Sequence, residues 1–283
     1  MAKLSSAPVA FFDSGIGGLT AVSSFLEKLP SENIVYFADT ANLPYGNKSS
    51  DEIFEFVSKA VDFFRKFLPK LIVIACGTAS SVVLKKYVDL KCLSWDVPIL
   101  DVVLPACSDS VKLTRNKKIG VIGTKKTIEL GVYREKLKKI YPDLDVFCRS
   151  CPELASIIER DICGTAGNDN IFSDSIKAVL KDYLSPFDDK NIDTLILGCT
   201  HYALVKNCIS EYLGPDITLL DIGHSVSVKA IDFLINNKLI NTINKSSNFT
   251  AFLTKEDKNF FFKANKILGK YKFSDFNVNT VGT

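Results

Sequence analysis

The chain alternates short apolar runs with amphipathic segments along its length. Short runs rich in valine, isoleucine and phenylalanine are typical of strands buried on both faces of a parallel sheet. The segments between them repeat apolar residues every three or four positions, as helices that cover a sheet do. The expected strands lie at 9–12, 34–38, 71–75, 97–100, 119–123, 144–147, 193–197, 217–221 and 249–253.

Turn and capping residues set the ends of the expected helices. Pro30 and Pro69 stop the helices at 19–29 and 49–68, because proline lacks the N–H that a helix interior needs. Ser49 with Glu52 predicts a capping box, and we expect Thr254 to cap the last helix at 255–268. Further helices are expected from 77 to about 87 and at 105–113, 125–140, 154–159, 172–184 and 225–236, with a loop around Trp95 and a flexible stretch at 164–170.

One order of elements occurs twice: strand, polar turn, helix, strand, loop, helix, strand and cysteine. Asp13 to Cys76 spans 63 positions in the first copy, and Thr124 to Cys199 spans 75 in the second. We therefore expect two pseudo-symmetric doubly wound α/β domains with mostly parallel sheets and a cleft between them. The first expected domain comprises 1–101 with 214–283 and the second 102–213, with linkers near Asp101 and Gly214.

Composition narrows the class of protein. The chain has 283 residues, 47% of them hydrophobic, which is enough for two packed cores. The net charge of +3 is too small to require a nucleic acid or a membrane as partner. We expect the basic stretch 112–139 to be a solvated face, with attraction of an anionic ligand as the alternative. No targeting segment or membrane-spanning run is evident, so we expect a cytoplasmic protein.

The eight cysteines lie in apolar or strand-like contexts, which favours free thiols in a reducing cytosol over disulfides. Cys148 and Cys151 have the spacing of a redox or metal-binding pair. Pro152 follows directly, however, and the sequence has neither a second such pair nor a histidine nearby. We therefore expect no metal site.

Two cysteines, Cys76 and Cys199, stand where a buried strand ends and a helix begins. Ligands of open α/β sheets bind at such strand ends, and helix N-termini favour a thiolate. Two thiols facing each other across a cleft suit inversion of a carbon centre, in which one base removes a proton and the opposite acid returns one. This scheme requires no cofactor.

Other polar residues are candidates to support the two thiols. Asp13, Glu159 and His201 are candidates to set their protonation. The glycine-rich turn at 13–18 would let backbone N–H groups approach an anion, although it matches no nucleotide-binding fingerprint and a plain tight turn is the alternative. Ser14, Thr78 and Thr200 offer hydroxyl groups for a substrate carboxylate.

Several motifs together resemble those of glutamate racemases in the cofactor-independent aspartate/glutamate racemase superfamily. The resemblance covers nearly the whole chain. Its motifs are the turn DSGIGG at 13–18, the loop 38–46 ending in Pro-Tyr-Gly, Ala-Cys-Gly-Thr-Ala-Ser at 75–80, Gly-Val-Ile-Gly-Thr at 120–124, Gly-Cys-Thr-His-Tyr at 198–202 and Thr-Lys-Glu-Asp at 254–257.

The resemblance implies roles for individual residues. Cys76 would act on D-glutamate with help from Asp13, and Cys199 on L-glutamate with help from Glu159 and His201. The product would supply peptidoglycan synthesis, with glutamate as the small-molecule partner and a homodimer as an open alternative to a monomer. The residues at substrate-binding positions of the family are Asp13, Ser14, Pro44, Tyr45, Gly46, Gly77, Thr78, Thr124, Thr200 and His201.

One position departs from the family pattern. Asparagine usually follows the first cysteine, and here the residue is Gly77. Glycine has no side chain to donate to a substrate, so we expect Gly77→Asn to raise kcat/KM for glutamate. Two alternatives stay open: a racemase of another small acid such as aspartate, and a carboxylate-binding regulatory relative with weak turnover.

Overall fold

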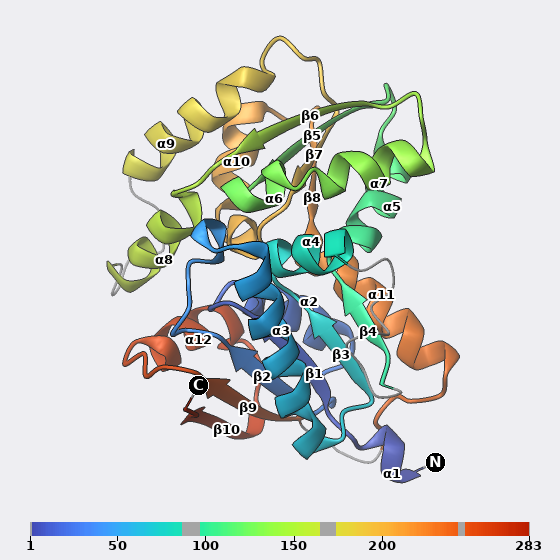
Figure 1. Cartoon of the computed structure of the whole chain (residues 1–283), viewed down its shortest axis with the longest axis vertical. Coiled ribbons are helices and arrows are strands. Elements are labelled where there is room, and N and C mark those ends of the chain that lie inside the picture. The colour runs from blue at the N-terminus through green and yellow to red at the C-terminus, as the bar shows by residue number, and fades with distance from the viewer. Residues whose placement is uncertain (1, 87–96, 165–173, 243–246, 283) are drawn as a thin grey trace.

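The computed structural model describes residues 2–86, 97–164, 174–242 and 247–282. The chain forms two parallel sheets, each covered by helices on both faces, and Figure 1 shows one sheet with its helices above the other. The expected α/β class with doubly wound parallel sheets is confirmed. In the described part of the chain, no helix is both long and apolar enough for a membrane span.

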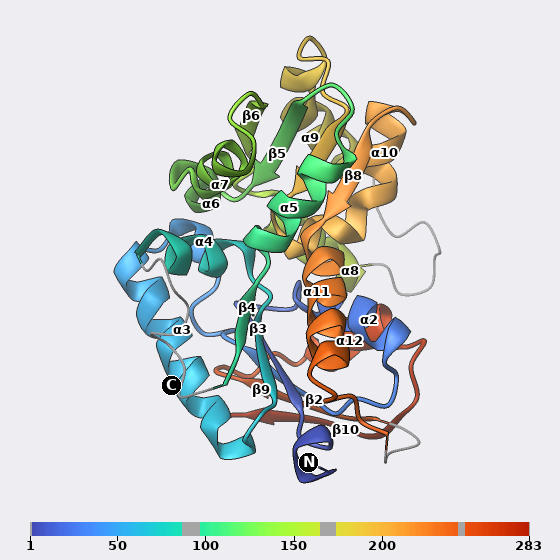
Figure 2. The ribbon, with the colours of Figure 1, turned by 90° about the vertical axis from the view of Figure 1, so that its right-hand side faces the viewer.

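The first sheet has six strands, all parallel, in the order β10-β9-β2-β1-β3-β4. Alternate residues of its central strand enter different cores: Phe11 packs with α2, α11 and α12, and Phe12 packs with α3 and α4. Figure 2 shows these two groups of helices on opposite faces. The strands are β1 (Val9–Asp13), β2 (Ile34–Ala38), β3 (Leu71–Ile74), β4 (Ile99–Asp101), β9 (Ser247–Leu253) and β10 (Phe273–Thr280).

The second sheet has four parallel strands in the order β6-β5-β7-β8. This order repeats β2-β1-β3-β4 of the first sheet, as the repeated sequence pattern predicts. Helices α5 and α7 pack on one face, and α8, α9 and α10 on the other. The strands are β5 (Lys118–Gly123), β6 (Asp145–Ser150), β7 (Thr194–Leu197) and β8 (Thr218–Asp221).

The helices lie near their expected places. The capping box at Ser49 and Glu52 is formed at the start of α3. The α-helices are α1 (Ala2–Ser5), α2 (Leu19–Lys28), α3 (Ser50–Phe64), α4 (Gly77–Lys86), α5 (Val103–Leu113), α6 (Lys125–Glu129), α7 (Val132–Ile140), α8 (Leu154–Gly164), α9 (Asp174–Leu184), α10 (Lys206–Leu213), α11 (Ile222–Asn236) and α12 (Phe260–Leu268). The 3-10 helices are η1 (Tyr45–Asn47), η2 (Arg65–Phe67), η4 (Ser185–Phe187) and η5 (Thr200–Val205).

The structure differs from the sequence expectations at several points. The linker expected near Gly214 is misplaced, because β8 pairs with β7 and the chain leaves the second sheet only after Asp221. Strand β10 was not expected. Thr254 does not cap the last helix: its hydroxyl donates to Asp39 Oδ1 at 2.7 Å, and α12 begins only at Phe260. The loop near Trp95 and residues 165–170 of the expected flexible stretch lie outside the described residues.

A buried ion pair joins distant parts of the first domain, defined here as the six-stranded sheet and its helices. Lys70 Nζ donates to Glu32 Oε2 at 2.5 Å and to the carbonyl oxygens of Ser5 and Leu239 at 2.6 and 2.8 Å. Glu32 Oε1 accepts the N–H of Asn241 at 2.7 Å. Because both charged side chains are almost fully buried, each depends on the other for compensation.

We predict that Lys70→Met lowers the free energy of unfolding by about 3–5 kcal/mol, since it leaves the Glu32 carboxylate buried without its cation. Urea denaturation measures the loss. As a control, Lys59→Met removes an exposed lysine paired with Glu55 and should cost less than about 1 kcal/mol. A loss as small for Lys70→Met as for the control would contradict this account of the ion pair.

Candidate active site

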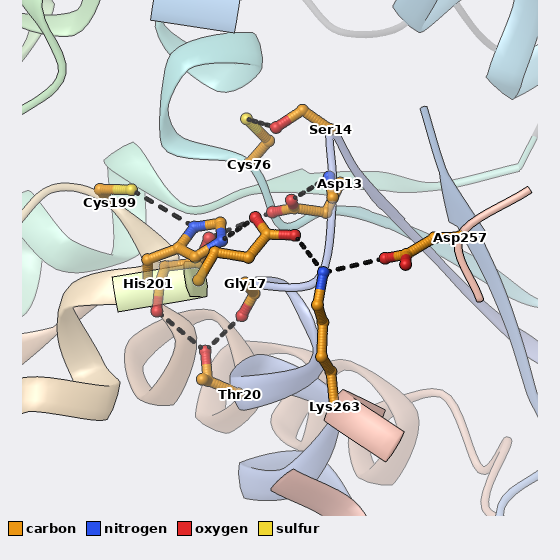
Figure 3. Close-up of polar contacts among 12 residues, drawn as sticks. Asp13, Ser14, Gly17, Thr20, Cys76, Cys199, His201, Asp257 and Lys263 are labelled. Atoms are coloured by element: carbon orange, nitrogen blue, oxygen red, sulfur yellow. Dashed lines mark hydrogen bonds and ion pairs between the residues drawn. The ribbon is translucent and has the colours of Figure 1, made fainter. Parts of the chain in front are cut away.

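The carboxyl ends of the two sheets meet at the boundary between the first domain and the second domain, the four-stranded sheet with its helices. Asp13 ends β1, Cys76 follows β3, Thr124 follows β5 and Cys199 follows β7. Each cysteine thus occupies the equivalent place in its own sheet. Figure 3 shows the two thiols with the polar side chains that surround them.

A small cavity of about 60 Å³ separates the two domains at this place. Both catalytic candidates, Cys76 and Cys199, line it. Of the residues expected at the site, Asp13 alone is not part of its wall. The lining residues are Ser14, Gly15, Leu43, Pro44, Tyr45, Gly46, Asn47, Cys76, Gly77, Thr78, Thr124, Pro152, Ala155, Ser156, Glu159, Cys199, Thr200 and His201.

The thiol of Cys76 is held in its protonated form. Its sulfur lies 3.7 Å from Ser14 Oγ and is buried at the start of α4. Burial and the nearby charge of Asp13 raise the pKa of Cys76 to about 12, and the hydrogen bonds from Ala79 and Ser14 oppose this only in part. The position at a helix N-terminus predicts a lowered pKa, and desolvation overrides that effect here.

Asp13 lies behind the cavity wall and ties the two domains together. Its Oδ1 accepts the N–H of Gly15 at 2.8 Å, and its Oδ2 accepts the hydroxyl of Thr200 at 3.1 Å. Burial raises the pKa of Asp13, against the opposing effects of His201 and these hydrogen bonds. Asp13 therefore acts on Cys76 through its charge, and it contacts the second domain through Thr200.

Cys199 has a different electrostatic environment. Its sulfur lies 3.8 Å from His201 Nδ1, and His201 Nε2 lies 3.3 Å from Glu159 Oε2. Burial disfavours the imidazolium, but the hydrogen bonds to Cys199 and Glu159 outweigh it and raise the pKa of His201 well above its ordinary value. The positive charge of His201 thus lies beside the Cys199 sulfur.

Glu159 is the carboxylate that supports His201. Burial alone would raise its pKa, but the hydrogen bond and charge of His201 and the charge of Lys263 lower the pKa of Glu159 to about 2. Lys263 and Asp257 were not among the expected site residues. The sequence feature that could have identified Lys263 is its position on the same face of α12 as Phe260 and Ala264, which are both buried.

Three threonine hydroxyls form a second bridge between the domains. Thr78 Oγ1 lies 2.9 Å from Thr124 Oγ1, which in turn lies 2.9 Å from Thr127 Oγ1. In the loop after β2, whose Gly46 lies next to Thr124, Tyr45 donates its hydroxyl to Asp39 Oδ2 at 2.6 Å, which fixes this loop. Thr127 and Asp39 were not expected at the site. Thr127 holds Thr124 and Asp39 holds Tyr45, and both of these partners were expected there.

Gly77 does not leave room for a larger side chain. A Cβ built on Gly77 would lie 2.2 Å from the carbonyl oxygen of Gly198, a backbone atom of the second domain. Ile222 Cδ1 would lie 3.3 Å away. The structure thus contradicts the expectation that asparagine would improve this site, because any side chain here forces the two domains apart or shifts the turn that carries Cys76.

The cysteines at 148 and 151 pack into different hydrophobic clusters. Cys151 belongs to the core that includes α8 and α9, and Cys148 packs against the core on the other face of the sheet. The six cysteines whose side chains the structure describes are free. Within the described residues, no group of three or more histidine, cysteine, aspartate or glutamate side chains is arranged to hold a metal ion.

Comparison with known proteins places this arrangement in a family. The model of the Asp/Glu/hydantoin racemase family matches residues 24–228. The chain is 34% identical to glutamate racemase 2 of Caldanaerobacter subterraneus subsp. tengcongensis, over 94% of this chain and 95% of that protein. The chain therefore belongs to the Asp/Glu/hydantoin racemase family, and its similarity to glutamate racemases identifies it as an amino-acid racemase.

Solved structures agree with this assignment. The crystal structure of glutamate racemase isoform RacE1 from Bacillus anthracis has a TM-score of 0.86 and 31% identity, and the match covers 97% of each chain. Glutamate racemase from Francisella tularensis, crystallised with D-glutamate, has a TM-score of 0.85 and 32% identity over 98% of each chain. Both sheets, and the boundary between them, are thus shared with these proteins.

We predict that Gly77→Ala and Gly77→Asn both lower kcat/KM for the amino-acid substrate by about tenfold or more. Displacing Cys76 by even one ångström from its reactive position is costly. Steady-state kinetics on variants whose fold is verified by circular dichroism provides the measurement, with Gly282→Ala as control because its added Cβ meets nothing within 4 Å. An increase in kcat/KM for Gly77→Asn would show that the domains accommodate the side chain.

Proposed function

We propose that this protein interconverts L-glutamate and D-glutamate by a two-thiol acid/base mechanism. The observation that carries the proposal is the pair Cys76 and Cys199, which line one cavity from equivalent strand ends of two sheets. Their different surroundings support it further. Burial and the charge of Asp13 raise the pKa of the Cys76 thiol, whereas the Cys199 sulfur lies beside the His201 ring.

The resemblance to glutamate racemases implies that Cys199 acts on L-glutamate. The thiolate of Cys199 removes the α-proton, and the electron pair of that C–H bond stays on the α-carbon. The Cys76 thiol then delivers its proton to the opposite face of the carbon, which inverts the stereocentre. Cys199 ends as a thiol and Cys76 as a thiolate, so proton exchange with water must restore the starting state before the next turnover in this direction.

Hydroxyl and backbone donors are suited to hold the two carboxylates of the substrate. Ser14, Thr78, Thr124 and Thr200 place hydroxyl groups around the cavity, and the first turn of α4 offers N–H groups that lack helical partners. Among the described lining residues there is no lysine or arginine. Neutral donors would bind the carboxylates without adding a charge that competes with the imidazolium of His201.

The proposal extends to a cellular role. The relatives named above are glutamate racemases, and the resemblance of the motifs implies the same substrate here. D-Glutamate produced by this reaction would supply peptidoglycan synthesis in the cytoplasm.

We predict that Cys76→Ala and Cys199→Ala each reduce racemisation of glutamate to background, because each removes one of two obligatory proton carriers. Circular dichroism at a fixed wavelength follows the loss of L-glutamate optical activity, with L-aspartate as the competing substrate. The matched control is Cys208→Ala, a free thiol outside the cavity, which should retain wild-type rates.

Three results would contradict the proposal. Wild-type rates in either alanine variant would remove that thiol from the reaction. Loss of activity after treatment with a chelator would indicate a metal-dependent reaction. A higher kcat/KM for aspartate than for glutamate would change the substrate.

A further inference from the structure

A lysine from the first domain is buried against site residues that the second domain contributes. Lys263 lies on α12, is only 7% exposed, and donates from Nζ to Glu159 Oε1 and to Asp257 Oδ2, both at 2.9 Å. Figure 3 shows its ammonium group extended toward the cluster around His201. Burial of a lysine is costly unless its charge is compensated, so these two contacts hold it in one place.

The contacts of Lys263 continue to the sulfur of Cys199. Glu159 gives one oxygen to Lys263 and the other to His201 Nε2, at 3.3 Å. The other ring nitrogen of His201 lies 3.8 Å from Cys199 Sγ. The four side chains therefore form one line of contacts from α12 to the thiol.

We propose that Lys263 is a positioning residue for proton transfer at Cys199. Its ammonium fixes one carboxylate oxygen of Glu159, so that the other oxygen faces His201 and orients the imidazole toward the sulfur. This inference rests on the proposed function, since it assigns Lys263 to one of the two thiols in that mechanism.

The position of Lys263 in the fold adds a second consequence. Glu159 lies on α8 of the second domain, whereas Lys263 and Asp257 belong to the first. The contact between them therefore exists only when the two domains lie together as they do here. The ion pair between Lys263 and Glu159 thus couples closure of the cavity to the orientation of the His201 ring beside Cys199.

A test of this role must distinguish the two thiols. The enantiomers have equal free energies in water, so kcat/KM is the same in both directions and cannot reveal which side is impaired. Primary isotope effects can do so. With α-deuterated L-glutamate the isotope effect reports removal of the deuteron by Cys199, and with α-deuterated D-glutamate it reports removal by Cys76.

For Lys263→Met we expect kcat/KM to fall about tenfold or more, because the Cys199 step becomes slower. The isotope effect should rise for α-deuterated L-glutamate and fall for the D enantiomer. Lys263→Arg, which retains the cation, should restore values close to wild type. The control Lys266→Met removes an exposed lysine from the same helix and should change neither isotope effect.

Equal changes in the two isotope effects, or no recovery with arginine, would overturn the role of Lys263. If Lys263→Met does not fold, Lys263→Gln can replace it, because glutamine keeps a hydrogen-bond donor. The isotope effects for the two enantiomers should then diverge in the same direction but by less, and unchanged isotope effects in Lys263→Gln would also overturn the proposal. An opposite divergence would support the role of Lys263 but reassign Cys199 to D-glutamate. A wild-type protein that does not racemise glutamate would refute the proposed function instead.

Discussion

The site depends on the closed contact between the carboxyl ends of the two sheets. The polar contacts that cross it include Thr200 to Asp13, Thr78 to Thr124, and Lys263 to Glu159. Glycines make the close approach sterically feasible, since a Cβ at Gly17 would lie 2.4 Å from Thr200 Oγ1 and 2.5 Å from His201 Nδ1. Both thiols are thereby largely buried, and each nearby charge has a larger effect than it would in solvent.

The same closure gives the two thiols unequal environments. Desolvation and a neighbouring carboxylate keep Cys76 protonated, whereas an imidazolium supported by Glu159 lies beside Cys199. The two sheets have the same strand order, so this difference does not come from the fold. It comes from which charged side chains the loops and helices bring to each strand end.

Much of this arrangement could be predicted from the sequence because strand ends are easy to locate. Apolar runs that stop at Cys76 and Cys199 place both thiols at carboxyl ends of parallel strands, and the repeated order of elements pairs the sheets. Periodicity says less about β10, because this strand at the sheet edge has no fully buried residue and lacks a continuous apolar run. Periodicity also cannot assign β8 to the second sheet, because the apolar run of this strand is compatible with either sheet.

Contacts across the domain boundary could not be predicted in this way. From the sequence alone, Gly77 in place of asparagine indicates a missing hydrogen-bond donor to the substrate. The steric reason for glycine becomes visible only from the position of Gly198 in the structure. Lys263 lies 104 positions from Glu159, far beyond the range of any local pattern. The pKa of Cys76 likewise depends on burial created by both domains, which outweighs the local effect of the helix N-terminus.

The central claim, that each thiol serves one face of the α-carbon, is tested most directly by α-deuteration in D2O. Starting from L-glutamate, nuclear magnetic resonance of early reaction samples should show D-glutamate carrying deuterium at the α-carbon, while the remaining L-glutamate is unlabelled. This outcome is expected because the deuteron that Cys76 delivers comes from solvent. Equal early labelling of both enantiomers would indicate a single base acting on both faces and would contradict the account.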